Sequence, residues 1–316
     1  MIHYRPFRNC DPPAIAKIWR AQPGSSPLMQ PVTAGLFDEL VFSKPYFARE
    51  GLILAVDDNA EPVGFVHAGF GPNDERSGLD LERGTTSLLL VAPHPDRETI
   101  ARELLSESEQ YLGQSGAKTI CGGGTELLAP FYLGLYGGAR LPGVLASDSL
   151  EIDVFRVAGY EELPCREIMR RRLDGFRPPI DRHLVQIRRK FQLHQTADPV
   201  PTTWWDACTY SQIDRIRFEL TRTSGGEPIA TADFWDIEPL ASHWGAHAMG
   251  LLSLEMRTAD SDLATFFLGE SLRQLQAFGT MLVEVQIAPG DTQLTNICLH
   301  LGFEHHDRGV LFRKRD

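Results

Sequence analysis

The feature that most constrains this chain is an internal repeat. The stretch Glu61-Pro62-Val63-Gly64 recurs in the second half of the chain as Glu227-Pro228-Ile229-Ala230, and each copy follows a polar turn and leads into an apolar run. Further along, Val91 and Leu254 also match, and the shift in numbering is nearly the same for both pairs. A nearly constant shift indicates two copies of one folding unit. The 316 residues are enough for both copies, at roughly 150 residues per domain.

The same order of elements is predicted in each copy. The return strands of two hairpins are expected near residues 62–70 and 228–235, because both stretches are apolar and follow turn residues. A third strand is expected at Thr86 to Val91 in the first copy and at Ala248 to Leu254 in the second. Each third strand leads through a short loop into a helix with apolar residues on one face. This pattern predicts an α/β (α+β) fold with two tandem domains.

The two copies diverge near their ends. Each copy closes on a helix followed by a Gly-aromatic pair, Gly159-Tyr160 and Gly302-Phe303, but the shift in numbering between these pairs is clearly smaller. The first copy therefore holds extra residues, which fall in the glycine-rich stretch 122–148. Long loops of this kind are often functional. The Pro/Gly-rich stretch 174–181 is typical of a boundary, so we place the domains at 1–176 and 177–316.

Composition excludes several classes of function. The formal net charge of −11 argues against nucleic-acid binding, which requires neutralisation of phosphates. No run of about 18 apolar residues is present, so no membrane span is expected. The five cysteines are scattered without a CxxC pair, which argues against disulfides and against a metal site. These features are typical of a cytoplasmic protein.

The order of helix, hairpin, strand–loop–helix, strand, helix and Gly-aromatic strand resembles the GNAT superfamily of N-acetyltransferases. The resemblance covers nearly the whole chain twice, and the tandem pair is similar to the architecture of mycothiol synthase. It implies two GNAT-like domains, each with a mixed, mostly antiparallel sheet flanked by helices. It also implies that acetyl-CoA is the co-substrate.

In the family, the loop after the third strand and the start of the next helix bind the pyrophosphate of acetyl-CoA, because glycines let backbone N–H groups turn towards the phosphates. The first copy keeps this spacing without the glycines, and Thr99 and Ala101 stand where two of them are usual. The second copy has Asp260 and Asp262 in the matching loop, and aspartates oppose phosphate binding. We therefore expect the N-terminal domain to bind acetyl-CoA and the C-terminal domain to be degenerate. The expected cofactor-binding residues are Leu90, Val91, Arg97, Glu98, Thr99, Ile100 and Ala101.

The catalytic residues usual in the family are missing. A tyrosine that protonates the leaving thiolate would stand at Phe155 or Cys298. The resemblance suggests replacements within the first-copy insertion, where Tyr132 and Tyr136 follow Glu126. These three residues are the predicted catalytic group, although the aromatic residues would equally serve to fix the insertion to the core.

The expected function is an acyl-CoA-dependent N-acetyltransferase that transfers an acetyl group to a small-molecule amine, without nucleic-acid or membrane partners. The alternative is a non-catalytic acyl-CoA sensor, or a scaffold, built on a decayed acetyltransferase, which the missing glycines and tyrosine favour. Because a tandem pair imitates a dimer of single units, a monomer is expected.

Overall fold

The computed structural model describes residues 1–23, 28–129, 131–179, 182–237 and 244–315. The strands are β1 His3–Pro6, β2 Leu52–Val56, β3 Pro62–Pro72, β4 Leu79–Val91, β5 Thr119–Gly122, β6 Val144–Leu145, β7 Glu161–Arg172, β8 Phe191–Ala197, β9 Arg215–Arg222, β10 Ala230–Asp236, β11 Ala248–Met256, β12 Leu282–Ile287 and β13 Glu304–Arg313. The helices are α1 Pro12–Arg20, α2 Ala34–Phe37, η1 Asp38–Phe42, η2 Arg49–Gly51, α3 Arg97–Gln114, α4 Ser149–Val157, α5 Arg182–Lys190, α6 Trp204–Tyr210, α8 Ser261–Ala277 and α9 Thr292–His300. The predicted boundary stretch 174–181 is described only as far as Pro179.

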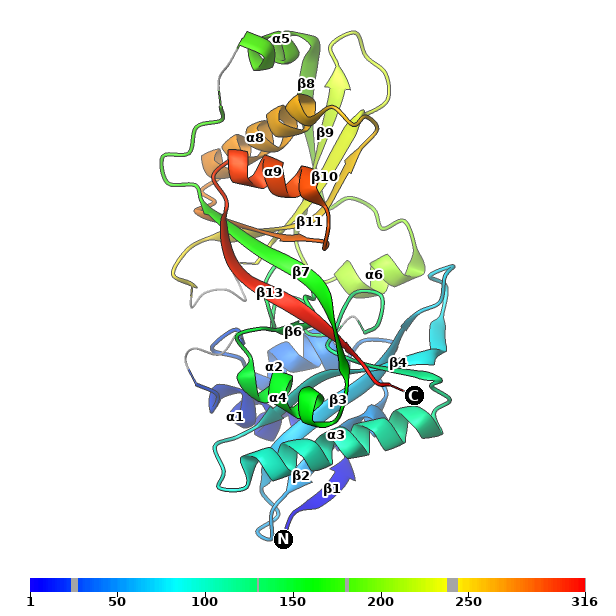
Figure 1. Ribbon diagram of the computed structural model, residues 1–316. Helices are drawn as coiled ribbons and strands as arrows, with labels where there is room; N and C mark the ends of the chain where they lie inside the picture. The colour runs from blue at the N-terminus through cyan, green and yellow to red at the C-terminus, as the bar shows by residue number, and fades with distance from the viewer. Residues whose placement is uncertain (24–27, 130, 180–181, 238–243, 316) are drawn as a thin grey trace.

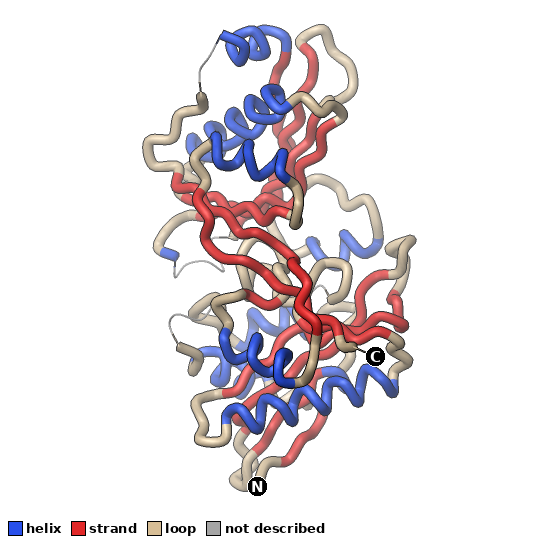
Figure 2. The backbone as a smooth tube through the Cα atoms, in the orientation of Figure 1, coloured by secondary structure: helices blue, strands red, loops and turns tan. Residues whose placement is uncertain are grey.

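The strands of both copies join in one sheet. Within the described residues their order is β1-β2-β3-β4-β5-β13-β7-β12-β11-β10-β9-β8, and β6 pairs with β13 outside this path. The order is symmetric about the β13–β7 pair, which crosses the middle of the molecule (Figures 1 and 2). The first half consists of β1 to β7 with their helices, and the second half of α5 to β13. The predicted fold class is confirmed, with the two sheets fused into one.

The fusion depends on an exchange of strands. The last strand of the second half, β13, pairs with β5 of the first half, and the last strand of the first half, β7, pairs with β12 of the second. The two exchanged strands also pair with each other along most of their length, from Glu304↔Arg170 to Arg313↔Glu161. An unpaired strand edge exposes backbone hydrogen-bonding groups, and this exchange covers the edges of both β5 and β12.

Predicted elements are found close to their expected bounds, with two informative differences. The helix α1 begins at Pro12 with Asp11 at its N-cap position, but the Asp11 side chain makes no cap hydrogen bond. Its carboxylate instead accepts hydrogen bonds from Arg5 and from the Arg8 backbone N–H. The strand β4 begins at Leu79, earlier than expected, because it continues the long β3–β4 hairpin.

The glycine-rich insertion of the first half packs against both halves. Its aromatic residues Phe131, Tyr132 and Tyr136 are buried in a core that also contains Trp205 and Trp235 of the second half. The indole N–H of Trp235 donates to the Ala139 carbonyl at 2.8 Å, and that of Trp205 donates to the Glu126 carbonyl at 3.3 Å. Burial of large aromatic side chains makes this insertion a main contact between the halves.

A buried carboxylate also joins the insertion to the second half. Glu284 on β12 is fully buried, and its oxygens accept hydrogen bonds from the Ala139 N–H at 2.8 Å, Gln286 Nε2 at 3.0 Å and Arg170 Nε at 2.9 Å. The chain passes so close that a Cβ at Gly138 would lie 2.5 Å from a Glu284 oxygen. Gly138 also has a φ of +90°, which favours glycine. Removal of the carboxylate would leave several buried donors without an acceptor.

We therefore expect Glu284→Leu to destabilise the protein by about 3–5 kcal/mol, because breaking a buried ion pair leaves the other charge uncompensated. Urea unfolding of the purified variants measures this. The exposed Glu304→Leu on β13 is the control and should change stability by less than about 0.5 kcal/mol. Equal stabilities of the two variants would show that the Glu284 network does not hold the halves together.

Candidate functional site

In each half, two neighbouring parallel strands stop pairing at the same place in the sheet. In the first half, β4 and β5 pair in parallel only from Arg83↔Thr119 to Thr86↔Gly122, although β4 continues to Val91. The strands β11 and β12 likewise pair only as far as Leu251↔Val285, and β11 continues to Met256. The free edges of β4 and β11 therefore face the first turns of α4 and α9. We call these two regions the first-half gap and the second-half gap.

A β-bulge lies at the start of each gap. The pairing of β4 with β3 skips Ser87, and that of β11 with β10 skips Leu252. Bulges re-aim the backbone and recur next to active sites. The two bulges make Leu89 and Leu254 structurally equivalent, because each is the second residue after the skipped one.

Acidic side chains fill the first-half gap. Glu151 on α4 is buried and accepts a hydrogen bond from the Leu89 N–H. Asp148 caps the same helix by accepting from the Glu151 N–H at 3.4 Å. Burial raises the pKa of Asp148 to about 6, and burial together with Asp148 raises the pKa of Glu151 well above its ordinary value. The Leu89 N–H, which would otherwise face a ligand in this gap, is thus already hydrogen-bonded to Glu151.

The two predicted catalytic tyrosines lie around this gap and are buried. The Tyr136 hydroxyl accepts from the Leu145 N–H at 2.9 Å and donates to Asp148 at 3.5 Å. The Tyr132 hydroxyl is hydrogen-bonded to His67 Nδ1 at 2.9 Å, and its ring stacks on Trp19. Burial raises the pKa of both hydroxyls well above the ordinary value.

The histidine beside Tyr132 is buried and neutral. Burial lowers the pKa of His67 to about 3, and its Nε2 atom has no hydrogen-bond partner among the described residues. Tyr132 itself has a φ of +70°, an unusual conformation for a bulky residue. This strained, buried pair lies on the face of β3 and β4 that is covered by α1 and the insertion.

Glu126 does not lie with the two tyrosines. It is at the boundary between the halves, where its carboxylate is 2.6 Å from Arg140 Nε and 3.6 Å from Arg166 Nη2. Burial favours the protonated form, but the two guanidinium groups hold the pKa of Glu126 below its ordinary value. The structure therefore divides the predicted catalytic group between two places.

Most of the predicted cofactor-binding residues belong to the core. Leu90, Val91, Ile100 and Ala101 are buried. Arg97 donates from Nε to the Val91 carbonyl at 3.0 Å and from Nη2 to Gln22 Oε1 at 2.8 Å, so its guanidinium is bound within the first half. The remaining two residues, Glu98 and Thr99, are exposed in the first turn of α3.

The second-half gap contains a groove of about 410 Å³. Leu254, Met256, Arg257, Thr258, Ala259, Ala264, Asp291, Gln293, Leu294 and Ile297 line it. Asp291 caps α9 by accepting from the Leu294 N–H at 2.9 Å, as Asp148 caps α4. Leu294 therefore occupies the helix position of Glu151, so an apolar side chain replaces the carboxylate that fills the first-half gap.

A second cavity, which we call the inter-half cavity, lies on the opposite face of β11. It has a volume of about 500 Å³. Its walls are Arg76, Glu126, Leu127, Arg140 and Arg166 of the first half, with Val200, Pro201, Thr202, Trp205, Asp206, Tyr210, Arg215, Arg217, Thr231, Asp233, Leu252, Ser253 and Glu255 of the second. Because side chains alternate along a strand, Ser253 and Glu255 face this cavity while Leu254 and Met256 face the groove. A short length of one strand thus separates two cavities of different polarity.

Ser253 and Glu255 were not predicted from the sequence as site residues. The alternation of polar and apolar residues from Ser253 to Met256 is a signal that would have indicated a strand with two different faces. The equivalent residues of the first half, Leu88 and Leu90, are both apolar and buried. The first half is therefore closed on the face where the second half has its polar cavity.

The two positions that correspond to the family's tyrosine are buried. Phe155 stacks on Phe312 with ring centroids 4.9 Å apart. Cys298 is completely buried in the core of the second half, and burial raises the pKa of its thiol to about 12. Neither side chain lines the groove or the inter-half cavity.

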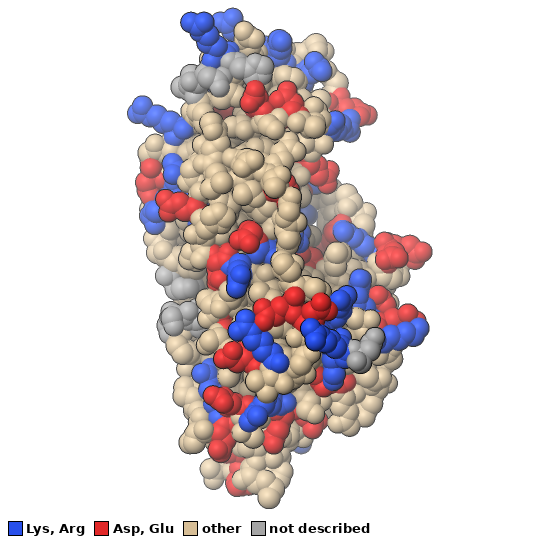
Figure 3. Space-filling model, in the orientation of Figure 1, with Lys and Arg blue, Asp and Glu red and all other residues tan. Residues whose placement is uncertain are grey.

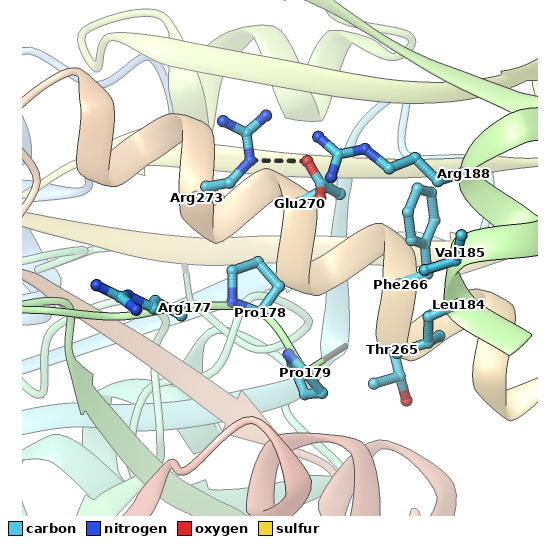
Figure 4. Close-up of a pocket in the computed structure, with 10 residues that line it drawn as sticks. All are labelled: Arg177, Pro178, Pro179, Leu184, Val185, Arg188, Thr265, Phe266, Glu270 and Arg273. Atoms are coloured by element: carbon cyan, nitrogen blue, oxygen red, sulfur yellow. Dashed lines mark hydrogen bonds and ion pairs between the residues drawn. The ribbon is translucent and has the colours of Figure 1, made fainter. Parts of the chain in front are cut away.

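A smaller hollow of about 220 Å³ lies between α5 and α8, away from both gaps (Figure 4). Its floor is apolar, and Arg177, Arg188 and Arg273 stand at its rim, with Arg273 Nε bonded to Glu270 at 2.8 Å. On the face drawn in Figure 3, basic and acidic side chains are interspersed. Among the described residues, no group of His, Cys, Asp and Glu has the arrangement of a metal site, and no helix is long and apolar enough to cross a membrane.

Comparison with solved structures identifies the fold. The chain is similar to a tandem GNAT protein from the clavulanic acid biosynthesis pathway, with a TM-score of 0.69, 14% identity and coverage of 99% of this chain and 98% of that one. It is similar to a GCN5-related N-acetyltransferase from Sphaerobacter thermophilus, with a TM-score of 0.62, 15% identity and coverage of 99% and 95%.

A third similar structure is a GCN5-related glucosamine N-acetyltransferase region of a fungal multi-domain GH3 β-N-acetylglucosaminidase. The TM-score is 0.70 at 13% identity, and the match covers 99% of this chain and 38% of that one. No protein-family model matches the sequence, and no curated protein matches it. The chain has the tandem GNAT fold, as the order of its elements predicted.

The buried carboxyl of Asp148 gives a testable pH dependence. Because its pKa is raised in the folded protein, Asp148 binds its proton more tightly there than in the unfolded chain, and stability should fall as the pH rises through about 4 to 6. Asp148→Asn keeps a good N-cap residue and should reduce this fall by about 1–3 kcal/mol.

Urea unfolding at several pH values measures the effect. The control is Asp291→Asn, at the matching but exposed cap of α9. Identical pH profiles for the two variants would contradict the assignment of the pH dependence to Asp148.

Proposed function

We propose that the protein is an acyl-CoA-dependent N-acyltransferase that transfers an acetyl group from acetyl-CoA to a small-molecule amine, and that the reaction takes place in the second half. The observation that carries this proposal is the position of the β11 tail, from Leu252 to Met256, between the groove and the inter-half cavity. A transferase must bring two substrates together from separate binding regions. The expectation that the C-terminal domain is degenerate is therefore replaced by the opposite assignment.

The groove has the chemistry to hold the acyl-CoA arm. Leu254, Leu294 and Ile297 supply apolar walls, and Thr258 and Arg257 supply polar groups at one side. The Leu254 N–H is equivalent to the Leu89 N–H that Glu151 occupies in the first half. In the GNAT family, which this chain resembles, a backbone N–H of this strand polarises the thioester carbonyl. Such donors stabilise developing negative charge.

The inter-half cavity supplies a base. Glu255 lies on β11 beside the thioester-binding edge, and its exposed carboxylate is suited to accept a proton from the amine. The amine nitrogen forms a bond to the carbonyl carbon as the carbon–sulfur bond breaks, and the electron pair of that bond leaves with sulfur. The proton lost by the amine is taken up by Glu255, and the thiolate gains one proton from solvent.

One observation favours the alternative of a binding module without turnover. The Asp260 side chain accepts from the Asp262 and Leu263 N–H groups, each at 3.0 Å, and so occupies the helix terminus that binds pyrophosphate in the family. Thiol release from acetyl-CoA with a panel of amines separates the two functions, since a sensor binds acetyl-CoA without turnover. We further propose that the protein acts as a monomer, because its halves already complete each other's sheets.

The location of the acyl-CoA site is tested by Leu294→Glu, which places in the second-half gap the carboxylate that fills the first. We expect at least about a tenfold loss of acetyl-CoA affinity by calorimetry, because a carboxylate next to the Leu254 N–H competes for it. The control is Leu299→Glu on the same helix, where the side chain is 47% exposed. Unchanged binding by a folded Leu294→Glu variant would place the acyl-CoA site elsewhere.

The role of Glu255 is tested by Glu255→Gln. We expect kcat to fall by about 100-fold or more with little change in the KM for acetyl-CoA, as for loss of a general base. Glu219→Gln is the matched control. Glu219 on β9 and Glu255 on β11 lie opposite Thr231 of β10 in the sheet, one on each side, but Glu219 does not line the cavity. A Glu255→Gln variant with normal kcat would rule out this base.

A further inference from the structure

The charges of the inter-half cavity are unevenly compensated. Five arginines and four carboxylates line it within the described part of the chain. Arg217 and Asp233 form a two-pronged ion pair, with N–O distances of 2.7 and 2.8 Å, so each neutralises the other. Arg76 is paired with Asp206 at 3.2 Å. Arg215, on the second-half side, has no carboxylate partner among the described residues. Its guanidinium donates to the Pro199 carbonyl and lies 5.7 Å from the centroid of the Tyr210 ring.

The remaining first-half arginines share one carboxylate. Arg140 holds Glu126 through a direct hydrogen bond of 2.6 Å, whereas Arg166 reaches the other Glu126 oxygen only at 3.6 Å. Two guanidinium charges thus face one carboxylate charge at this end of the cavity. A cavity partly removed from water makes such an imbalance costly unless a ligand carries the missing negative charge.

Arg166 also has a donor without an acceptor. Its Nε atom is buried and has no hydrogen-bond partner among the described residues. Buried donors are nearly always hydrogen-bonded, so an exception on the wall of a cavity indicates a missing partner. The Nε and Nη groups of one edge of a guanidinium match the two oxygens of a carboxylate.

The opposite charge stands on β11. Glu255 lines the same cavity from the second half and has no direct ion pair among the described residues, although its charge acts on Arg217, which is bonded to Asp233. The cavity therefore has an excess cation at Arg166 on its β7 wall and a carboxylate without a direct ion pair on its β11 wall, with Arg215 as a further cation on β9. This polarity matches a molecule with a negative group at one end and an amine at the other.

We infer that the acceptor is an amino carboxylate, whose carboxylate binds Arg166 beside Arg140 and whose amine faces Glu255. This inference rests on the proposed function, since it names the substrate class of that site. A carboxylate is favoured over a phosphate monoester, because one net positive charge at Arg140, Arg166 and Glu126 balances one negative charge.

The test compares acceptors that differ only in their anionic end. The acyl acceptors are 4-aminobutanoate, butylamine and phosphoethanolamine, assayed by thiol release from acetyl-CoA. We expect 4-aminobutanoate to have a kcat/KM at least about tenfold above that of either other amine. Equal values for 4-aminobutanoate and butylamine would overturn the inference, and a preference for phosphoethanolamine would replace the carboxylate by a phosphate.

The variant Arg166→Met removes the charge while keeping a side chain of similar length. It should raise the KM for 4-aminobutanoate by about 10- to 100-fold and change the KM for butylamine far less. Arg172→Met on the same strand is the control, because Arg172 is exposed and does not line the cavity. An Arg166→Met variant that keeps the wild-type ratio of the two KM values would contradict the assignment.

A binding measurement distinguishes failure of this inference from failure of the proposed function. Calorimetry of the full chain with 4-aminobutanoate requires no turnover. Binding that is lost in Arg166→Met, together with no thiol release for any amine, would support the carboxylate site and refute the transferase. Thiol release with butylamine, without preference for or binding of 4-aminobutanoate, would support the transferase and refute the carboxylate site.

Discussion

The unpaired backbone edges at β5 and β12 are the constraint on which the rest of the structure depends. Each half builds its sheet as far as this edge and then has no strand of its own beside it. The edges are covered because β13 and β7 cross over and pair with the opposite half as well as with each other. The resulting continuous sheet fixes how the two halves face each other, and so it creates the inter-half cavity.

Within this nearly symmetric frame, a few substitutions make the halves different. Glu151 fills the gap of the first half, whereas Leu294 leaves the gap of the second half open. Leu88 and Leu90 are buried in the first half, whereas Ser253 and Glu255 line a cavity in the second. On the face of Leu88 and Leu90 the first half is thus packed where the second half has a cavity, and its insertion adds aromatic residues to the same core, although a hollow of about 440 Å³ remains between α3 and α4. Duplicated units commonly preserve a fold while sites change, because function depends on particular side chains.

The repeat in the sequence was sufficient to predict the tandem fold, because the periods of strands and helices report which residues form elements. It did not predict the exchange of β7 and β13, since the pattern of a strand does not indicate which edge it joins. The site was harder to predict for a related reason. The bulges make Leu89 the structural equivalent of Leu254. The match of the apolar patterns had instead aligned Leu254 with Val91, and so it assigned the wrong equivalent positions along the third strand. Whether an isolated charge such as that of Glu126 is free or paired also depends on distant residues, in this case Arg140 and Arg166.

The exchange of strands has a consequence for how the chain is made. The β5 edge leaves the ribosome early, but its neighbour β13 is synthesised only after every other strand of the second half. At ~5–20 residues per second, the roughly 190 intervening residues take about 10–40 s to translate. Throughout that time the nascent first half carries an open edge that another copy on the same messenger could pair with. Closure of the β5 edge therefore has to wait for β13, however early the rest of the first half folds.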